Sequence, residues 1–265
     1  MMNPFRLLSI EWRKLLPYRA FWIALAAYTL LMPSLFISLH NFNINVGSNE
    51  LSISFYNFPD VWHNVAYIAS WFNILLYFFV ILLVGNEYQY KTFRQNIIDG
   101  MSRSQALLSK LYLITGFAAG STLLVTALGF LCGYYLGEVA AYPVSFEKFE
   151  YMGMYFLQVL GYMSMALCIT HLLRKQGMSI VVFLMYAFIA EPVIQYKVLK
   201  DWIPLPQVAD YLPVNTMGKL IGNPLPGYFG LGEPAVINMQ AAGVTTAYIV
   251  AFTLLSYLMV RSRDL

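Results

Sequence analysis

The sequence predicts an all-α integral membrane protein, and three observations support this fold class. Hydrophobic residues make up 59% of the 265 residues and charged residues only 11%, whereas a soluble domain carries roughly 25% charged residues. The apolar residues gather into six runs, each close to the roughly 20 residues that a helix needs to cross a bilayer. Within each run the apolar residues are continuous, which favours helices over the alternating strands of a membrane barrel.

We predict a single transmembrane domain over residues 1–265, whose elements follow one another along the chain. Residues 3–19 mix aliphatic and aromatic residues with charged ones, which is typical of a helix lying in the membrane interface. The predicted spans cover residues 20–39, 65–85, 111–137, 151–173, 176–196 and 239–260. Residues 40–64 are expected to form a loop on the outer side.

The segment 86–110, between spans two and three, is unusually charged for its surroundings. Its apolar residues recur every three or four positions: Tyr90, Phe93, Ile97 and Met101. This spacing predicts a short amphipathic helix, which Gly100 should end before Ser102 caps the next helix. Such a helix can dock into a groove of a soluble partner or lie flat on lipid headgroups.

The segment 197–233, between spans five and six, contains five prolines and five glycines. It is too apolar for a free linker, so we predict short, broken, re-entrant helices on the outer side, covered by protein or water. Glu191 precedes this segment near the outer end of span five. A carboxylate within a span indicates a function or a buried partner, and Glu191 either reaches the outer interface or belongs to an outer gate or transport pathway.

The distribution of basic residues predicts the orientation. Of the 16 Lys and Arg residues, 12 fall on the side of the N-terminus if the chain crosses the membrane six times. By the positive-inside rule, both termini and the 86–110 segment are cytoplasmic. This topology accounts for the positive net charge, so we predict no nucleic-acid partner.

The sequence contains no recognisable nucleotide-binding, catalytic or metal-binding motif. The only Gly-Lys pair is Gly218-Lys219, and Pro213 stands where a phosphate loop needs its first glycine. We therefore predict no cofactor in this chain. The three histidines are scattered, so no metal site and no catalytic residue are predicted.

Glu87, Thr92-Phe93-Arg94, Ser102-Arg103 and Lys110 together resemble a pattern in permease subunits of type-2 ABC exporters, although Lys91 stands where that family often has Gly. The resemblance implies that 86–103 is a coupling helix seated in a cleft of an ATPase subunit. It assigns contact with that partner to six residues: Glu87, Thr92, Phe93, Arg94, Arg103 and Lys110. Among them, Glu87 and Arg94 would transmit closure of the ATPase pair, and Arg103 and Lys110 would anchor the chain at the headgroups.

The resemblance also implies the assembly. Two ATP-binding-cassette ATPase subunits, carrying ATP and Mg, would join this chain and a second permease, identical or related, in the lipid of a bacterial cytoplasmic membrane. The outer segment would close the pathway. Apart from the resemblance, apolar spans with few charges favour a hydrophobic or amphipathic cargo. The alternatives are an ion-coupled secondary carrier, which needs ionisable groups at the midplane, and an intramembrane enzyme, which needs paired polar residues deep in the spans.

Span three contains two sets of glycines at helical spacing. Gly116 and Gly120 form one set, and Gly129, Gly133 and Gly137 form the other. The nine residues from Gly120 to Gly129 rotate the helix by about half a turn, so the sets face opposite sides. Each set can serve close helix packing within the subunit or contact with a second copy.

Overall fold

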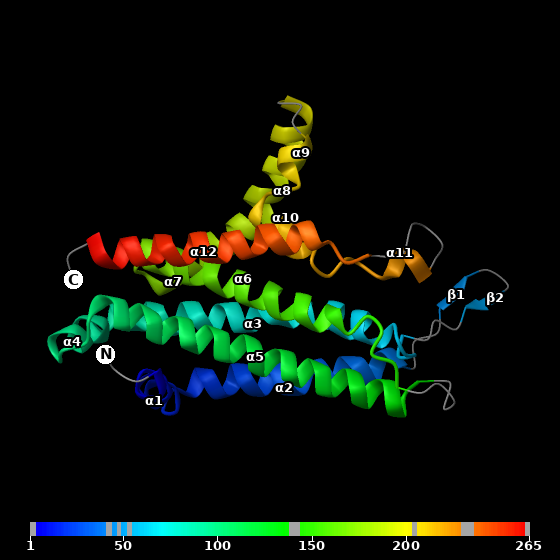
Figure 1. Ribbon diagram of the computed structural model, residues 1–265, viewed down its shortest axis with the longest axis horizontal. Helices are drawn as coiled ribbons and strands as arrows, with labels where there is room; N and C mark the ends of the chain where they lie inside the picture. The colour runs from blue at the N-terminus through cyan, green and yellow to red at the C-terminus, as the bar shows by residue number, and fades with distance from the viewer. Residues whose placement is uncertain are drawn as a thin grey trace.

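The computed structural model describes residues 4–40, 44–46, 49–51, 55–137, 144–202, 206–228 and 236–262. Its long helices lie side by side in one bundle (Figure 1). Six helices are long and apolar enough to cross a membrane: α2 (Arg19–His40), α3 (Val61–Gln89), α5 (Arg103–Tyr135), α6 (Glu150–Leu173), the helix that starts with α7 (Gln176–Met185), and α12 (Met239–Ser262). The chain is therefore an integral membrane protein by the length and composition of its helices.

Two of these helices extend well beyond the apolar runs. α3 continues to Gln89, and α5 already begins at Arg103. Most of the charged segment 86–110 therefore belongs to the ends of two long helices, and only α4 (Thr92–Ile98) stands between them. The extension is physically reasonable because backbone hydrogen bonds along a helix continue past the point where the side chains become polar.

α1 (Pro4–Leu15) precedes the bundle and packs across one end of α5. Residues four apart share a face of a helix, and α1 has three such faces. The buried face carries Leu7, Glu11 and Leu15, the exposed apolar face carries Leu8 and Trp12, and the exposed polar face carries Arg6 and Arg13. This pattern is typical of a helix in the membrane interface, except that its buried face contains a carboxylate.

The fifth long helix departs from a regular α-helix. After α7 come the π-helical stretch η1 (Tyr186–Ala190), one turn of α8 (Glu191–Val193) and a second π-helical stretch, η2 (Ile194–Trp202). From α8 to α9 (Pro206–Ala209) the chain projects away from the bundle, and it returns at α10 (Pro213–Gly218) (Figure 1). α11 (Leu225–Tyr228) follows. Short helices thus occupy the described parts of 197–233, while 203–205 and 229–235 lie outside the described residues.

The loop predicted over 40–64 contains an element that the sequence analysis did not predict. β1 (Ile44–Val46) and β2 (Asn49–Leu51) pair antiparallel, with Ile44 opposite Leu51. Three-residue strands are too short to show a period-two pattern, which explains why they were missed.

A layer of polar side chains, the hydroxyl layer of Tyr28, Asn73, Ser121 and Tyr155, joins four helices inside the bundle. The Tyr28 hydroxyl of α2 lies 2.6 Å from Ser121 Oγ of α5 and 2.9 Å from the Tyr155 hydroxyl of α6. Tyr155 in turn donates to Asn73 Oδ1 of α3 over 2.6 Å. All four side chains are buried. Buried hydrogen-bonded networks specify how helices are set against each other, because an unmatched register would leave polar groups without partners.

The two glycine sets of α5 have different environments. A Cβ at Gly129 would lie 3.3 Å from the Trp62 ring, and one at Gly133 would lie 2.6 Å from the Phe58 ring. This set therefore serves close packing within the subunit. A Cβ at Gly116 or Gly120 would meet no atom within 4 Å, so this set faces open space.

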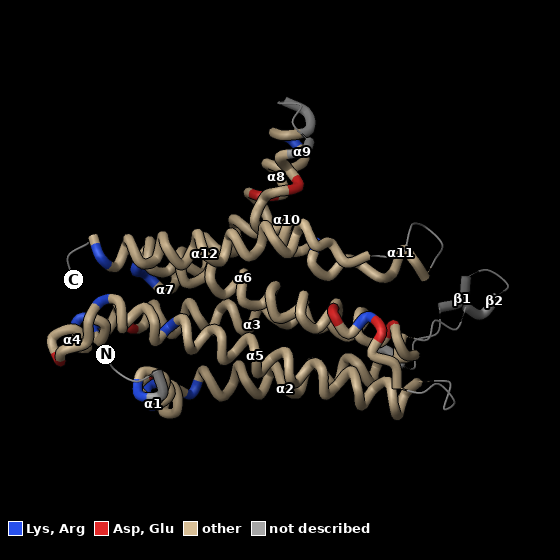
Figure 2. Tube along the Cα trace, viewed as in Figure 1, with Lys and Arg blue, Asp and Glu red and all other residues tan. Residues whose placement is uncertain are grey.

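The start of α1 and the end of α12 lie at the same end of the bundle, together with α4, and the β-ribbon and α11 lie at the opposite end (Figure 1). Lys and Arg residues gather at the end that holds α1 and α4 (Figure 2). The arrangement agrees with an even number of crossings, and the charged α4 region occupies the more basic end.

Candidate functional site

Four charged side chains from three helices meet at the end of the bundle that holds α4. Lys110 of α5 pairs with Glu11 of α1 and, over 2.5 Å, with Glu87 of α3. Lys14 of α1 lies 2.8 Å from the same Glu87 oxygen, Oε1, and 3.3 Å from Glu11. The cluster therefore contains two carboxylates and two ammonium groups, with a formal charge of zero.

Three of the four side chains are buried, and Lys14 is partly exposed. Glu11 and Lys110 are each 1% exposed and Glu87 is 4% exposed. Transferring such charges out of water costs several kcal/mol per ion unless each one is paired and hydrogen-bonded. Glu11 is fully engaged because Ser109 Oγ also donates to it over 2.9 Å. The cluster is thus an ionic clamp that ties α1, α3 and α5 together.

The environment alters the pKa of both α1 members of this ionic clamp. Burial opposes the charge on Glu11, but Lys110, Lys14 and the Ser109 hydrogen bond outweigh it and lower the pKa of this carboxyl below 4.5. Burial likewise opposes the charge on Lys14, but Glu87 and Glu11 outweigh it and raise the pKa of this ammonium above 10.5. Both groups are therefore charged at neutral pH.

α4 is delimited by two residues in the left-handed backbone region. Lys91 has φ of 56° and precedes the helix, and Gly100 has φ of 97° and follows it. Only glycine adopts the second conformation without strain. Ser102 then starts α5 with a capping box, in which its side chain and that of Gln105 bond to each other's backbone N–H. The predicted break at Gly100 and the predicted cap at Ser102 are confirmed.

The inner side of α4 is anchored in a small apolar cluster. Phe93 is 2% exposed and packs with Leu7 of α1, Met101, Ala106 of α5 and Val260 of α12. Ile97 is partly buried on the same side. Tyr90 does not share this face and is 69% exposed, because the left-handed turn at Lys91 separates it from α4. The prediction of a common apolar face is therefore wrong for Tyr90.

A second contact connects the end of α3 to the turn between α6 and α7. The Tyr88 hydroxyl lies 2.7 Å from His171 Nδ1, and the Tyr88 ring stacks on Phe93 with centroids 5.3 Å apart. The Arg174 guanidinium lies 5.5 Å from the centroid of the Tyr88 ring, within range of a cation–π interaction. Tyr88 therefore contacts both α4, through Phe93, and α6, through His171.

The other residues predicted to contact the partner differ in how exposed they are. Arg94 and Thr92 are exposed on α4. Arg103 is half-buried and donates to the carbonyl oxygens of Val260 and Arg261 at the end of α12. Lys110 was expected at the headgroups, and this expectation is wrong because its ammonium is buried between two carboxylates.

A cavity of about 390 Å³ lies beside α4, next to the ionic clamp. Its walls include Lys14, Glu87, Thr92 and Asn96. Glu87 Oε2 is buried, and among the described residues no group donates a hydrogen bond to it. The cavity therefore reaches Glu87, while its Oε2 atom is itself covered.

Glu191 contacts α10, which packs beside the middle of α6. Its side chain is 1% exposed, so it does not reach the outer interface. Its two oxygens accept hydrogen bonds from the backbone N–H groups of Val214, over 3.0 Å, and Asn215, over 2.6 Å. These are the first orphan N–H groups of α10, and a carboxylate there satisfies both the hydrogen bonds and the helix dipole.

Sequence reasoning did not single out Glu11 and Lys14. Glu11 resembled an ordinary surface charge among basic residues, but the positions of Leu7, Glu11 and Leu15 place it on the buried face of an amphipathic helix. Asn73 was also missed. A single amide within the apolar run 65–85 was the available signal.

The chain was compared with protein-family models and with curated proteins. The model of the family described as "ABC-2 family transporter protein" matches residues 7–190. This region includes α1, the ionic clamp, α4 and the first four long helices. A search of curated proteins found no match. Because the family match covers more than half of the chain, this protein belongs to the ABC-2 family of transporter permeases.

Proposed function

We propose that this permease is the membrane subunit of an ATP-driven exporter, powered by a separate ATP-binding-cassette ATPase that docks on residues 86–103. Two such ATPase subunits, which bind ATP and Mg, pair with two permeases, identical or related. Both termini and α4 lie on the cytoplasmic side of a bacterial cytoplasmic membrane. Hydrolysis takes place in the partner, and this chain converts the movement of α4 into transport.

The observation that carries this proposal is the two-sided character of α4. Its inner side is fixed by the buried ring of Phe93. Its outer side presents Arg94, Gln95 and Ile98, all exposed. A short helix that is anchored on one side and offers one apolar and several polar residues on the other suits docking into a cleft of a soluble protein.

The contacts behind α4 support a mechanism of transmission. A push on α4 acts on the end of α3, where Glu87 is bonded to α1 and α5 through Lys14 and Lys110. It also acts on α6 through Tyr88 and His171. Packed, ion-paired elements shift as units, since such interfaces do not deform continuously. α1, α3, α5 and α6 are therefore expected to respond together.

The cavity of about 390 Å³ beside α4 supports a specific contact with the ATPase. A side chain of the partner that enters it would lie next to Glu87. Because Glu87 belongs to the ionic clamp, the partner would then act on the group that connects three helices. Arg94, exposed on α4, would attract the partner to this helix by its charge.

A second cavity, of about 380 Å³, lies between α3, α6, η1 and α10, and it supports a hydrophobic or amphipathic cargo. Its walls include Trp71, Tyr77, Tyr162 and Phe183. Gln158 also lines it. A cavity walled mainly by aromatic side chains suits a ligand with a large apolar body. α10, held by Glu191, would be its outer cover.

The test is purification of the tagged chain from its own cells in mild detergent, followed by identification of co-purifying proteins and an ATPase assay. We expect an ATP-binding-cassette ATPase to be recovered with the wild-type chain. Arg94→Glu should lower this recovery at least several-fold, because it reverses an exposed charge on α4.

Arg13→Glu is the matched control, since Arg13 is an exposed arginine at the same end of the molecule but on α1. It should leave recovery of the ATPase unchanged. A wild-type chain that purifies without any ATPase, from membranes that hydrolyse no ATP in its presence, would contradict the proposal. Equal recovery with Arg94→Glu and with Arg13→Glu would show that α4 is not the docking element.

A further inference from the structure

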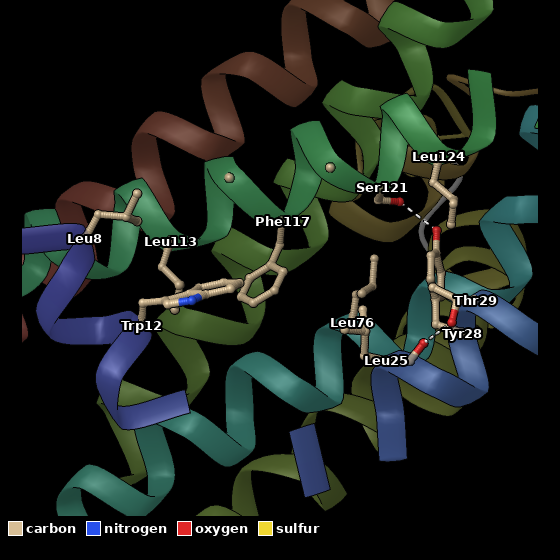
Figure 3. A pocket seen from close by; sticks show the side chains of 12 residues that line it. Leu8, Trp12, Leu25, Tyr28, Thr29, Leu76, Leu113, Phe117, Ser121 and Leu124 are labelled. Atoms are coloured by element: carbon tan, nitrogen blue, oxygen red, sulfur yellow. Dashed lines mark hydrogen bonds between the residues drawn. The ribbon is translucent and has the colours of Figure 1, made fainter. Parts of the chain in front are cut away.

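An apolar groove of about 370 Å³ runs along α5, between α5 and the helices α1 and α2 (Figure 3). Leu8, Trp12 and Leu113 lie at one end of it. Tyr28, Ser121 and Leu124 lie at the other. Gly116 and Gly120 form its wall on α5, and their missing side chains leave it open.

The length of the groove matches one leaflet of a bilayer. From Leu113 to Leu124, α5 rises by about 16 Å at about 1.5 Å per residue. Half of a hydrocarbon core of about 30 Å is about 15 Å. One end is at α1, where Trp12 is 45% exposed. Tryptophan is enriched at the level of the lipid headgroups. The groove therefore begins at the interface and ends near the middle of the bilayer.

The polar groups at the inner end need no ligand. The hydroxyls of Tyr28 and Ser121 bond to each other and to Tyr155. Thr29, which also lines the groove, donates to the Leu25 carbonyl over 2.8 Å. A ligand with polar groups in its deep portion would gain nothing there and would lose its own hydration. The groove suits a plain hydrocarbon chain.

We propose that this groove holds one acyl chain of a membrane lipid from the leaflet next to α1. The headgroup lies beside Trp12, and the terminal methyl group lies near Tyr28 and Ser121. A groove that is open to hydrocarbon loses dispersion contacts while it is empty, and lipid tails are present around it at the highest concentration of any apolar molecule. The bound acyl chain contacts α1 and the hydroxyl layer, and so stabilises the packing of α1 on α5.

A helix from a second copy is the competing occupant, because two glycines four residues apart also suit helix packing. The position of α1 favours the lipid. α1 crosses α5 at one end of the groove, with Leu8 and Trp12 inside it (Figure 3). A membrane-spanning helix laid along Gly116 and Gly120 would have to pass α1, whereas a lipid chain that starts at the headgroup begins there.

The experiment uses the full chain in vesicles of phosphatidylethanolamine and phosphatidylglycerol, with a photoactivatable diazirine midway along one acyl chain of the phosphatidylglycerol. After irradiation, labelled peptides are identified by mass spectrometry. We expect labelling of α5 between Leu113 and Leu124 to exceed that of the other lipid-facing helices several-fold. The double variant Gly116→Leu, Gly120→Leu fills the groove and should reduce this labelling to the level of the other helices.

Gly243→Leu on α12 is the matched control, since a Cβ at Gly243 also meets no atom within 4 Å. It should leave the labelling of α5 unchanged. All variants are compared by gel filtration and thermal midpoint, so that a misfolded variant is recognised. None of these measurements requires an ATPase or a transport assay, so the result is independent of the proposed function.

Two outcomes would overturn the proposal. Uniform labelling of all lipid-facing helices, unchanged by Gly116→Leu, Gly120→Leu, would mean that only bulk lipid passes along α5. Efficient disulfide formation between two copies carrying Gly116→Cys would mean that a second copy occupies the groove.

Discussion

Lys110 lies between Glu11 and Glu87, with all three side chains buried, so its removal should be costly. Lys110→Met leaves two buried carboxylates with Lys14 as their remaining partner within the ionic clamp. Removing one partner of a buried ion pair costs about 3–5 kcal/mol. We expect a clearly lower thermal midpoint in detergent than for Lys175→Met, which removes an exposed lysine at the same end of the bundle.

The double variant Glu87→Gln, Lys110→Met restores the balance of charge within the ionic clamp and should recover part of this loss. If Lys110→Met melts at the same temperature as Lys175→Met, the ionic clamp contributes no stability.

The pKa shifts of Glu11 and Lys14 predict how stability depends on pH. The pKa of Glu11 is lowered below 4.5 in the folded chain, so its contribution is present above that value and is lost as the pH falls through the lowered pKa. The pKa of Lys14 is raised above 10.5, so its contribution is present below that value and is lost as the pH rises through the raised pKa. The thermal midpoint should therefore form a plateau between these limits.

The variant Glu11→Gln, Lys14→Met provides the comparison for this pH profile, because it removes one charge of each sign. Its profile should be flatter at both limits than that of the wild type. Identical profiles for the two proteins would assign the pH dependence to other groups.

At this scale, the sequence did not reveal what the candidate residues contact. Glu87 was singled out by its place in a pattern that resembles a permease family. Its bonds to Lys14 and Lys110 could not be predicted, because they depend on how α1 and α5 pack against α3. Lys110 was misassigned to the headgroups for the same reason, since a lysine at the start of a span resembles an interfacial residue in sequence.

At the scale of single helices, the N-terminus of α10 is held by one side chain, Glu191. Glu191→Gln replaces a carboxylate by an amide at the two N–H groups of Val214 and Asn215. Hydrogen bonds to a charged group contribute about 1.5–3 kcal/mol, so amide hydrogen exchange over Pro213–Gly218 should accelerate about tenfold or more.

Hydrogen exchange followed by mass spectrometry checks this prediction, with Glu147→Gln as the control because Glu147 is exposed. Unchanged protection of α10 in Glu191→Gln would show that the carboxylate does not hold this helix in place.

Local signals predicted the elements well wherever a few neighbouring residues determine the structure. Gly100 correctly predicted the end of α4, and Ser102 correctly predicted the start of α5, because both effects operate within one turn of helix. The apolar runs gave six helices of spanning length. The chain leaves the bundle after α8 and returns at α10, where Glu191 bonds to residues more than 20 positions away. A contact over this distance could not be predicted from neighbouring residues.

For the molecule as a whole, two polar clusters at different depths of the bundle join the helices. The ionic clamp joins α1, α3 and α5 beside α4, and the hydroxyl layer joins α2, α3, α5 and α6 further along the bundle. α6 also contacts α10. If the ATPase acts on α4, binding of ATP should therefore change the hydrogen exchange of α10.

Glu87→Gln should retain the ATPase but abolish this ATP-dependent change, because the end of α3 would no longer be tied by charge to α1 and α5. Glu147→Gln should preserve it. This comparison requires no knowledge of the cargo, and a response that persists in Glu87→Gln would exclude Glu87 from the transmission route. Glu87→Ala is less informative than Glu87→Gln, because it also leaves a void among buried charges.

The neutrality of the ionic clamp has an evolutionary consequence. The charges of the two carboxylates and the two ammonium groups sum to zero only when all four groups are present. A change at one position therefore leaves a charge at another position without its partner. Positions 11, 14, 87 and 110 should therefore covary among homologous permeases: a sequence without the acid at 87 should also lack a base at 14 or 110. These four positions lie up to 99 residues apart in the chain, yet they should be inherited as a single unit.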